Sequence, residues 1–485
     1  MTEATKPATA LHSDLERNAI GALGATMQAI THISPAIAAF FYTQFVVSLA
    51  GITAPIAYLI GFVLVLMLGN SLVQLSKHLP SAGGYYTYVS RAIHPRMGFL
   101  TSWMYVLYSP LCGGPIYGFF GFITAGALKS YYGIDVPWLW WVCIVLGAPF
   151  VAFLQHQGIK ISTRAMLILG GFEIGIVFLL ALFGFLNPGP GGISLAVFNP
   201  MNMLKDDAGG LALSGFTLAI VFSVQGLTGW EAAAPLAEET ENPRRNVPIS
   251  VIASIILIGS FLVFVFWGII THFGVDSIDT LINSEELPAL KMAQDVWGAG
   301  WLLLLFAFLN SVIAVCLATA NVGTRMWYAM ARSGSFPKAL AKVEPNKKTP
   351  TNAILLQMCL SLVAALGVGF WLGPDVSFFL IDGLILVIGV TVVYLFANLA
   401  VVMFYRGEKK AEFNIVLHVI FPVISSLVLI YAVIQSFNPA PDAPYSYAPL
   451  IDGAWFVLGV VILLIYRARG NEAWILNAGE AIAEA

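Results

Sequence analysis

Residues 31–36 read Thr-His-Ile-Ser-Pro-Ala and lie midway along an apolar stretch that runs from about residue 18 to residue 49. Pro35 has no N–H group to donate to a helix, so it interrupts the helical hydrogen bonding here. Backbone groups left unpaired at membrane depth are costly unless a cavity or a ligand satisfies them. The stretch therefore predicts a broken membrane helix beside a binding site.

A second interruption lies at residues 223–229, which read Ser-Val-Gln-Gly-Leu-Thr-Gly within another apolar stretch. Gly226 and Gly229 weaken a helix, and the amide of Gln225 needs hydrogen-bond partners. The alternative interpretation is that Pro35 only kinks its helix and that the two glycines only allow close helix packing. We favour a site, because the two interruptions occupy matched positions in the two halves of the chain.

The composition places both interruptions in an integral membrane protein. Of the 485 residues, 59% are hydrophobic and 10% are charged, whereas soluble proteins average about 25% charged residues. This balance excludes a soluble enzyme, a disordered chain and, with a formal net charge of -3, a nucleic-acid-binding protein. Apolar runs long enough to cross a bilayer occur at about 18–49, 52–76, 97–128, 136–155, 163–186, 208–236, 247–271, 297–324, 350–373, 376–405, 413–437 and 448–466.

The broken spans are the first and the sixth of twelve predicted transmembrane helices. A separation of five is expected when helices 1 to 5 and helices 6 to 10 form inverted repeats, with the broken helices facing each other near the midplane. The predicted fold is therefore an all-α integral membrane protein with a 5+5 inverted repeat plus helices 11 and 12. The predicted regions are an N-terminal tail at 1–17, a ten-helix core at 18–405, helices 11 and 12 within 406–470, and a C-terminal tail at 471–485.

The distribution of basic residues predicts the orientation. With Arg17 inside and alternating spans, only Lys129, Lys205 and Lys291 fall outside, so 20 of the 23 Lys and Arg residues lie on the cytoplasmic side (23 minus 3). Positive charge near helix ends is retained on that side. We expect a multi-pass protein of the plasma membrane with both termini in the cytoplasm.

Four motifs resemble the amino acid, polyamine and organocation (APC) transporter superfamily. Leu79 to Tyr88, Leu-Pro-Ser-Ala-Gly-Gly-Tyr-Tyr-Thr-Tyr, looks like the glycine loop after the second helix of that family. Gly158 to Arg164 resembles the entry to its fifth helix. Gly229 to Arg245, with its Glu-Glu-Thr-Glu-Asn-Pro-Arg-Arg run, and Asn321 to Gly334 resemble its segments after helices 6 and 8. The resemblance covers about residues 20 to 405.

The resemblance implies a substrate site at the two interruptions, with contributions from helices 3, 8 and 10. The candidate substrate-binding residues are Thr31, His32, Ile33, Ser34, Pro35, Ala36, Ser223, Gln225, Gly226, Leu227 and Thr228. In helix 3, Tyr105 and Tyr108 are weaker candidates. Many family members carry a Gly-Ser-Gly-like break in helix 1, whereas this chain has His-Ile-Ser-Pro-Ala, which leaves the substrate headgroup open.

Three ionisable residues are candidates for proton coupling: Glu173, Glu231 and His32. A carboxyl group at membrane depth must be protonated or paired. Glu173 could therefore carry a proton, contact an amine substrate or form a structural hydrogen bond, and by resemblance its position holds a lysine in several sodium-independent relatives. Glu231 could secure the broken backbone or relay a proton. Sodium coupling stays open, with the possible oxygen ligands Asn310, Ser311, Thr319 and Asn321.

The remaining ionisable residues of the predicted spans indicate no further functional site. Asp382 and Asp452 are expected to face water at the outer side or to cap helices, and His418 is expected to be structural. No cofactor or metal site is predicted, and motifs of hydrolases, metalloproteases and nucleotide-binding loops do not occur.

We therefore expect a secondary transporter that works by alternating access and carries a neutral or weakly polar amino acid, coupled to protons. The alternatives are an amine or polyamine permease, an amino acid/amine exchanger, and a sensor or leak channel with the same fold. The two interruptions contain no cluster of acids, which argues against a polyamine. Symport or antiport and the oligomeric state stay open.

Overall fold

The computed structural model describes residues 13–205, 210–283, 287–438 and 441–480. Within these ranges the chain is helical and contains no β-strand, as predicted. The predicted tails at 1–17 and 471–485 lie partly outside the described residues, at 1–12 and 481–485.

The first half of the chain supplies eight helices. They are α1 Ala22–Ile33, α2 Pro35–Ile37, α3 Thr43–Ala50, α4 Ala54–Ser76, α5 Tyr85–Ala92, α6 Pro95–Tyr132, α7 Leu139–His156 and α8 Ile159–Leu186. A π-helical turn, Ala38–Tyr42, joins α2 to α3. The first predicted span is thus α1 to α3, interrupted after Ile33.

The second half repeats this order. Its helices are α9 Leu213–Gln225, α10 Pro243–Phe273, α11 Ile278–Ile282, α12 Pro288–Trp297, α13 Trp301–Ser333, α14 Thr351–Leu372, α15 Pro374–Phe378 and α16 Leu386–Gly407, followed by α17 Phe421–Ser436 and α18 Ala448–Ala468. A 3₁₀ segment, Trp230–Leu236, completes the broken span that begins with α9. The turn Phe379–Ile385 between α15 and α16 is π-helical, which the sequence did not predict.

The described residues contain eleven segments long and apolar enough to cross a membrane. The first of them, Ala22–Ser76, includes two predicted spans, because the chain turns at Gly51, whose φ is 59°. Counted as two, this segment brings the total to the twelve predicted transmembrane helices, which are therefore confirmed.

Corresponding helices of the two halves pack against each other. The second spans, α4 and α10, are in contact, and so are the third spans, α6 and α13. The first span α1 contacts α10, and α9 of the sixth span contacts α4 in the same way. The helices α7, α13 and α14 all contact α6. This pairing is the one expected of inverted repeats.

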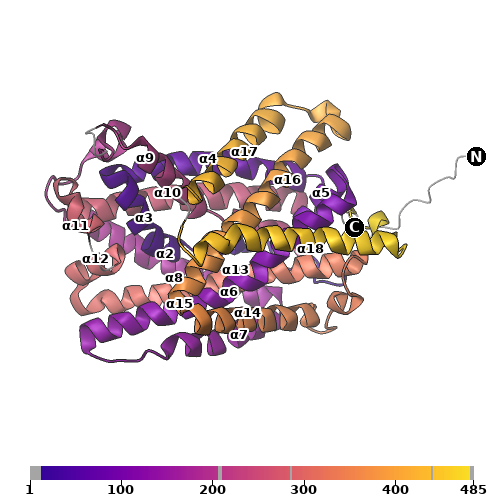
Figure 1. Cartoon of the computed structure of the whole chain (residues 1–485), viewed down its shortest axis with the longest axis horizontal. Helices are drawn as coiled ribbons and strands as arrows, with labels where there is room; N and C mark the ends of the chain where they lie inside the picture. Colours follow the sequence, from indigo (N-terminus) through magenta and orange to yellow (C-terminus); the bar gives the residue numbers. More distant parts are fainter. Residues whose placement is uncertain (1–12, 206–209, 284–286, 439–440, 481–485) are drawn as a thin grey trace, which may run out of the picture.

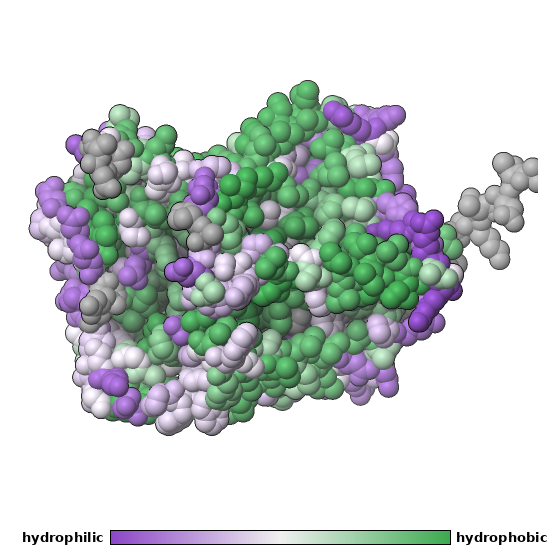
Figure 2. Space-filling model, viewed as in Figure 1, coloured by the Kyte–Doolittle hydropathy of each residue, from purple (hydrophilic) through white to green (hydrophobic). Residues whose placement is uncertain are grey.

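Figure 1 places α11 and α12 at one end of the molecule and the carboxyl end of α18 at the opposite end. Lys291 lies on α12, and Lys129 lies near the end of α6. Apolar side chains cover much of the visible surface between these two ends, and polar side chains gather toward the ends themselves (Figure 2). Such a surface fits a protein surrounded by lipid along its middle.

Candidate functional site

The first interruption lies at Ser34, where the helix ends and restarts. Ser34 has a φ of 60°, in the left-handed region, and its N–H donates to the Ile30 carbonyl at 3.1 Å. Pro35 then begins α2 as its first residue. The first N–H groups of a helix have no partner within the helix, and the amides of Ala36 and Ile37 have no backbone acceptor among the described residues, so they can bind an anionic group.

The second interruption lies between Gln225 and Trp230. The Thr228 N–H folds back to the Gln225 carbonyl at 2.9 Å, and the carbonyls of Gly226 and Leu227 receive no backbone hydrogen bond from the described residues. Free carbonyls at the end of a half-helix suit an ammonium group or another cation.

The two interruptions touch. Gly229 has a φ of 122°, and a Cβ atom at this position would lie 2.6 Å from the carbonyl carbon of His32 and 2.7 Å from the backbone nitrogen of Ile33. Only glycine allows this approach, because real Cβ contacts are never so short. The free amides of the first span and the free carbonyls of the sixth span therefore belong to one region.

Glu231 secures the second interruption. Its buried carboxylate accepts hydrogen bonds from the Gly229 N–H at 3.1 Å and from the Tyr105 hydroxyl at 3.1 Å. Tyr394 of α16 lies beside this carboxylate and stacks on Trp230 with 5.3 Å between ring centroids. Glu231 thus ties the broken backbone to the third and tenth spans.

His32 is joined to the third span by a similar contact. Its Nε2 atom and the Tyr108 hydroxyl are 2.7 Å apart, and the two rings are stacked with 6.0 Å between centroids. Tyr105 and Tyr108, the weaker candidates from the sequence, are both buried and contact the interruptions. The side chain of Thr31 instead donates to the Met27 carbonyl of its own helix at 2.7 Å.

Glu173 of α8 lies close to the first interruption. Its side chain is fully buried, and neither carboxylate oxygen has a hydrogen-bond partner among the described residues. Ser311 of α13 lies next to it, and the Ser311 hydroxyl is 2.7 Å from that of Ser34. Glu173 therefore stands beside the contact between the first and eighth spans.

The other candidates of the sixth span are placed less favourably. Ser223 is buried, donates to the Ala219 carbonyl at 2.8 Å, and packs against Gly61 of α4 rather than toward the first span. Leu227 is fully buried. Gln225 and Thr228 are half-buried, and the Thr228 hydroxyl donates to the Val224 carbonyl at 3.4 Å.

The four possible sodium ligands of α13 do not converge. Ser311 bonds Ser34, whereas Thr319 donates to the Val315 carbonyl at 2.8 Å and Asn321 donates to Ser162 at 2.8 Å. Eight residues of helix separate Ser311 from Thr319, a rise of about 12 Å. Asn310 donates to the Leu169 carbonyl. Ser311 is the one of the four that stands at the interruption.

An aromatic cluster that was not predicted from the sequence lies on the α3 side of the interruptions. The ring of Phe41 lies 5.8 Å from Phe119, 5.2 Å from Phe378 and 5.3 Å from Phe379. Phe119 and Phe378 stack at 4.2 Å. The pairs Phe40-Phe41 and Phe378-Phe379 were the available signal, but nothing in their spacing shows that three spans bring them together.

The opposite side of the interruptions is joined by ion pairs. Arg325 and Glu239 are both fully buried, and the Arg325 Nε donates to Glu239 at 2.9 Å. Arg332 donates two hydrogen bonds to Glu238, at 2.8 and 2.6 Å. The backbone N–H groups of residues 19 and 20, just before α1, donate to the Glu239 carbonyl. These contacts join the segment after the sixth span to the first and eighth spans.

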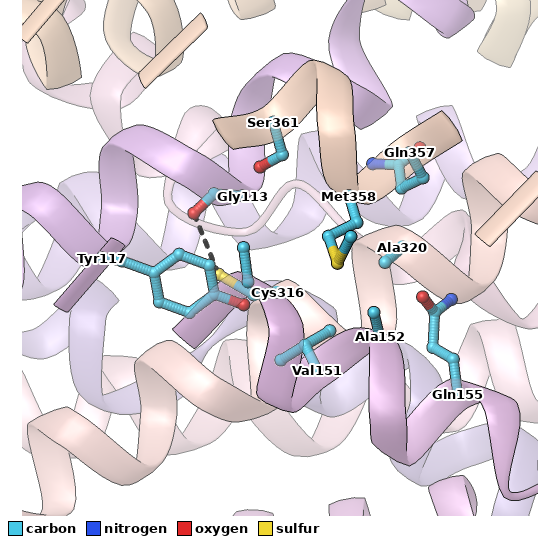
Figure 3. A pocket seen from close by; sticks show the side chains of 11 residues that line it. Gly113, Tyr117, Val151, Ala152, Gln155, Cys316, Ala320, Gln357, Met358 and Ser361 are labelled. Carbon is cyan, nitrogen blue, oxygen red and sulfur yellow. Dashed lines mark hydrogen bonds between the residues drawn. The ribbon is translucent and has the colours of Figure 1, made fainter. Parts of the chain in front are cut away.

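A small cavity inside the α6, α7, α13 and α14 helices is separate from the interruptions. Figure 3 shows Gln155, Gln357 and Ser361 around it, with the Cys316 thiol donating to the Gly113 carbonyl at 3.3 Å. Its volume of about 20 Å³ holds one water molecule. The cavity is too small for a solute, so it is not the candidate site.

Comparison with known protein families identifies the family to which this architecture belongs. The amino acid permease family model matches residues 24–472, nearly the whole chain. This chain belongs to the amino acid permease family. The match includes both interruptions and all twelve spans, so the APC resemblance drawn from the motifs is confirmed.

Curated relatives of this permease are transporters of different solutes. It is 25% identical to the low-affinity putrescine importer PlaP of Escherichia coli over 73% of this chain and 74% of the relative. It is 23% identical to the serine/threonine exchanger SteT of Bacillus subtilis, over 76% and 79%, and 22% identical to the human b(0,+)-type amino acid transporter 1, over 84% and 79%. The permease is therefore a multi-pass membrane transporter of a small molecule.

Proposed function

We propose that this permease carries a neutral or weakly polar amino acid across the cytoplasmic membrane by alternating access. The observation that carries the proposal is the contact between Gly229 and the His32–Ile33 peptide, which brings the two interruptions together. The free amides of Ala36 and Ile37 suit the substrate carboxylate. The free carbonyls of Gly226 and Leu227 suit its ammonium group.

The proposed substrate class follows from the charges at the interruptions. Glu231 already accepts hydrogen bonds from Gly229 and Tyr105, so it is not free to bind a second ammonium group. His32 and Tyr108 offer a polar but neutral contact when the imidazole is uncharged. A zwitterion with a small side chain matches this set better than a dication does.

We further propose that transport is coupled to protons through Glu173. Its carboxyl group is buried beside Ser311 with no hydrogen-bond partner among the described side chains. An unpaired carboxylate is costly there, so the group must gain a proton, or a partner that arrives during transport. Because Ser311 also contacts Ser34, the protonation of Glu173 can act on the first interruption.

The test is uptake of each common amino acid into proteoliposomes, with and without an inward proton gradient. Uptake is expected to saturate and to fall when the gradient is dissipated. Glu173→Gln should retain exchange of internal for external substrate but lose gradient-driven accumulation and its dependence on pH. Glu408→Gln, on an exposed residue, is the matched control and should behave as wild type. Gradient-driven accumulation by Glu173→Gln equal to wild type would contradict the coupling proposal.

A second candidate is an amine or polyamine permease, because a relative is named a putrescine importer. A diamine would need an acceptor for its second ammonium group, and Glu173, which has no hydrogen-bond partner among the described residues, lies beside Ser311 at the first interruption. Competition distinguishes the two: putrescine should not inhibit amino acid uptake at concentrations where the transported amino acid does. Strong inhibition by putrescine, lost in Glu173→Gln, would favour the diamine.

The orientation and the regional boundaries are also proposals. We propose that the end carrying Arg325, Arg332 and the carboxyl end of α18 faces the cytoplasm, with tails at 1–17 and 471–485 on that side and helices 11 and 12 outside the ten-helix core. The excess of Lys and Arg at that end supports this orientation. A protease added to intact cells should leave a tag at either terminus uncut.

A further inference from the structure

Asp452 is a buried carboxyl group that the transport mechanism does not use. The sequence indicated that it faces water near the outer end of helix 12 or caps a helix, and the structure shows neither. Its residue is only 3% exposed, and neither carboxylate oxygen has a hydrogen-bond partner among the described residues. A buried carboxyl group without a partner is costly, so a ligand that supplies one would be stabilised.

Asp452 lines a groove between α6, α16, α17 and α18. The groove has a volume of about 560 Å³, within the range of about 300 to 1,000 Å³ that is typical of small-molecule sites. Apart from Asp452, its lining is apolar: Met104, Ile388, Val392, Leu395, Phe396, Leu399, Val433, Pro449, Gly453 and Phe456. The face of the molecule over α16, α17 and α18 is largely apolar in Figure 2. The lining residues Leu399, Pro449 and Gly453 are exposed, so the groove opens to the surface.

The groove is polar at one end and apolar along its length. A Cβ atom on Gly389 would lie 3.4 Å from an Asp452 carboxylate oxygen, which places the carboxylate beside Gly389 of α16, at the Ile388 end of the groove. From Ile388 the apolar wall continues along one face of α16 to Leu399. Eleven residues of helix correspond to about 16 Å. A ligand that fits this shape has a single polar head and one extended apolar chain.

The side chains that line the groove determine which head group of a ligand can bind there. A carboxylate in an apolar environment binds most strongly to a group that donates charge-assisted hydrogen bonds. The lining contains no lysine or arginine, so a phosphate group would have no partner there. We propose that this groove binds a single-chain lipophilic amine, with its ammonium group on Asp452 and its chain along α16. This inference does not rest on the proposed function.

Binding to the purified full-length protein in phosphatidylcholine nanodiscs tests the proposal. Dodecylamine should raise the melting temperature and bind saturably, whereas dodecanol and dodecanoate should bind at least about tenfold more weakly, since they lack the charged donor. Asp452→Asn should weaken dodecylamine about tenfold and leave dodecanol unchanged. Asp442→Asn, on an exposed residue shortly before α18, is the matched control and should change neither.

A second variant keeps the proposal testable if Asp452→Asn is unstable. Gly453 lines the groove, and a Cβ atom there meets nothing within 4 Å. Gly453→Leu should therefore place a side chain in the groove and weaken dodecylamine binding. Equal affinity for dodecylamine and dodecanol would overturn the proposal, and so would unchanged binding by Asp452→Asn or Gly453→Leu. Displacement of dodecylamine by phosphatidylethanolamine would overturn the single-chain assignment.

Discussion

The buried carboxyl groups of this permease fall into two regions with opposite surroundings. From the second interruption onward, Glu231 accepts two hydrogen bonds, and Glu238 and Glu239 are each held by an arginine. In α8 and α18, Glu173 and Asp452 have no hydrogen-bond partner among the described residues. The first group therefore holds the structure together, whereas the second group is available to a proton or a ligand.

The largest effect is expected from removing a partner of the first group. Arg325→Ala leaves the charge of Glu239 buried and unpaired, and we expect it to lower the free energy of unfolding by about 3 to 5 kcal/mol. Thermal unfolding of the detergent-solubilised protein measures this loss. Arg325→Lys should recover only part of it, because lysine cannot donate two parallel hydrogen bonds. An unchanged melting temperature for Arg325→Ala would show that the pair is not structural.

A smaller loss is expected at Glu231. Glu231→Ala leaves the Gly229 N–H and the Tyr105 hydroxyl without their acceptor, and at about 1 kcal/mol for each of these neutral donors we expect a loss of about 2 kcal/mol. Glu231→Gln keeps an acceptor oxygen and should retain most of the stability. If the two variants lower the melting temperature equally, the carboxylate acts through its charge rather than through these two hydrogen bonds.

The smallest effect concerns the pH dependence of Glu238. Burial alone would raise the pKa of this carboxyl group, but hydrogen bonds from Arg332 and from the Ala82 N–H outweigh burial and hold the pKa below its ordinary value of 4.5. A depressed pKa contributes stability above the ordinary value, and this contribution is lost as the pH falls through the folded-state pKa.

Melting temperatures of wild type and Glu238→Gln, measured from neutral pH downward, check this sign. The difference between them should be largest at neutral pH and should shrink only below about pH 4.5. A difference that grows on acidification would mean that the Glu238 pKa is raised instead.

Local chemistry made part of this architecture predictable. Pro35 has no N–H, and Gly226 and Gly229 weaken helices, so the positions of both interruptions follow from the sequence. The spans follow from their apolar composition, with ends that differ by a few residues, as where the span predicted at 97–128 is found at Pro95–Tyr132.

The partners of the buried groups were not predictable in the same way. Tyr105 and Glu231 are 126 positions apart, and Ser34 and Ser311 are 277 positions apart. Such pairs depend on how the spans pack. Asp452 was misplaced for the same reason: a position one turn from a helix end suggests water, but the packing of α16 against α18 buries it.

Protection of an introduced thiol by the substrate tests whether the two interruptions form one solute site. Thr228 is half-buried at the sixth-span interruption, and Ser214 is exposed at the start of the same span. Thr228→Cys and Ser214→Cys would each be made in a chain whose four native cysteines are replaced, and uptake by each variant would be verified. The rate of modification by a small thiol reagent is then measured with and without the transported amino acid.

At a substrate concentration ten times the dissociation constant, modification of Thr228→Cys should slow about tenfold, and modification of Ser214→Cys should not change. Equal modification rates of Thr228→Cys with and without saturating substrate, in a variant that still transports the substrate, would show that the two interruptions do not form the solute site.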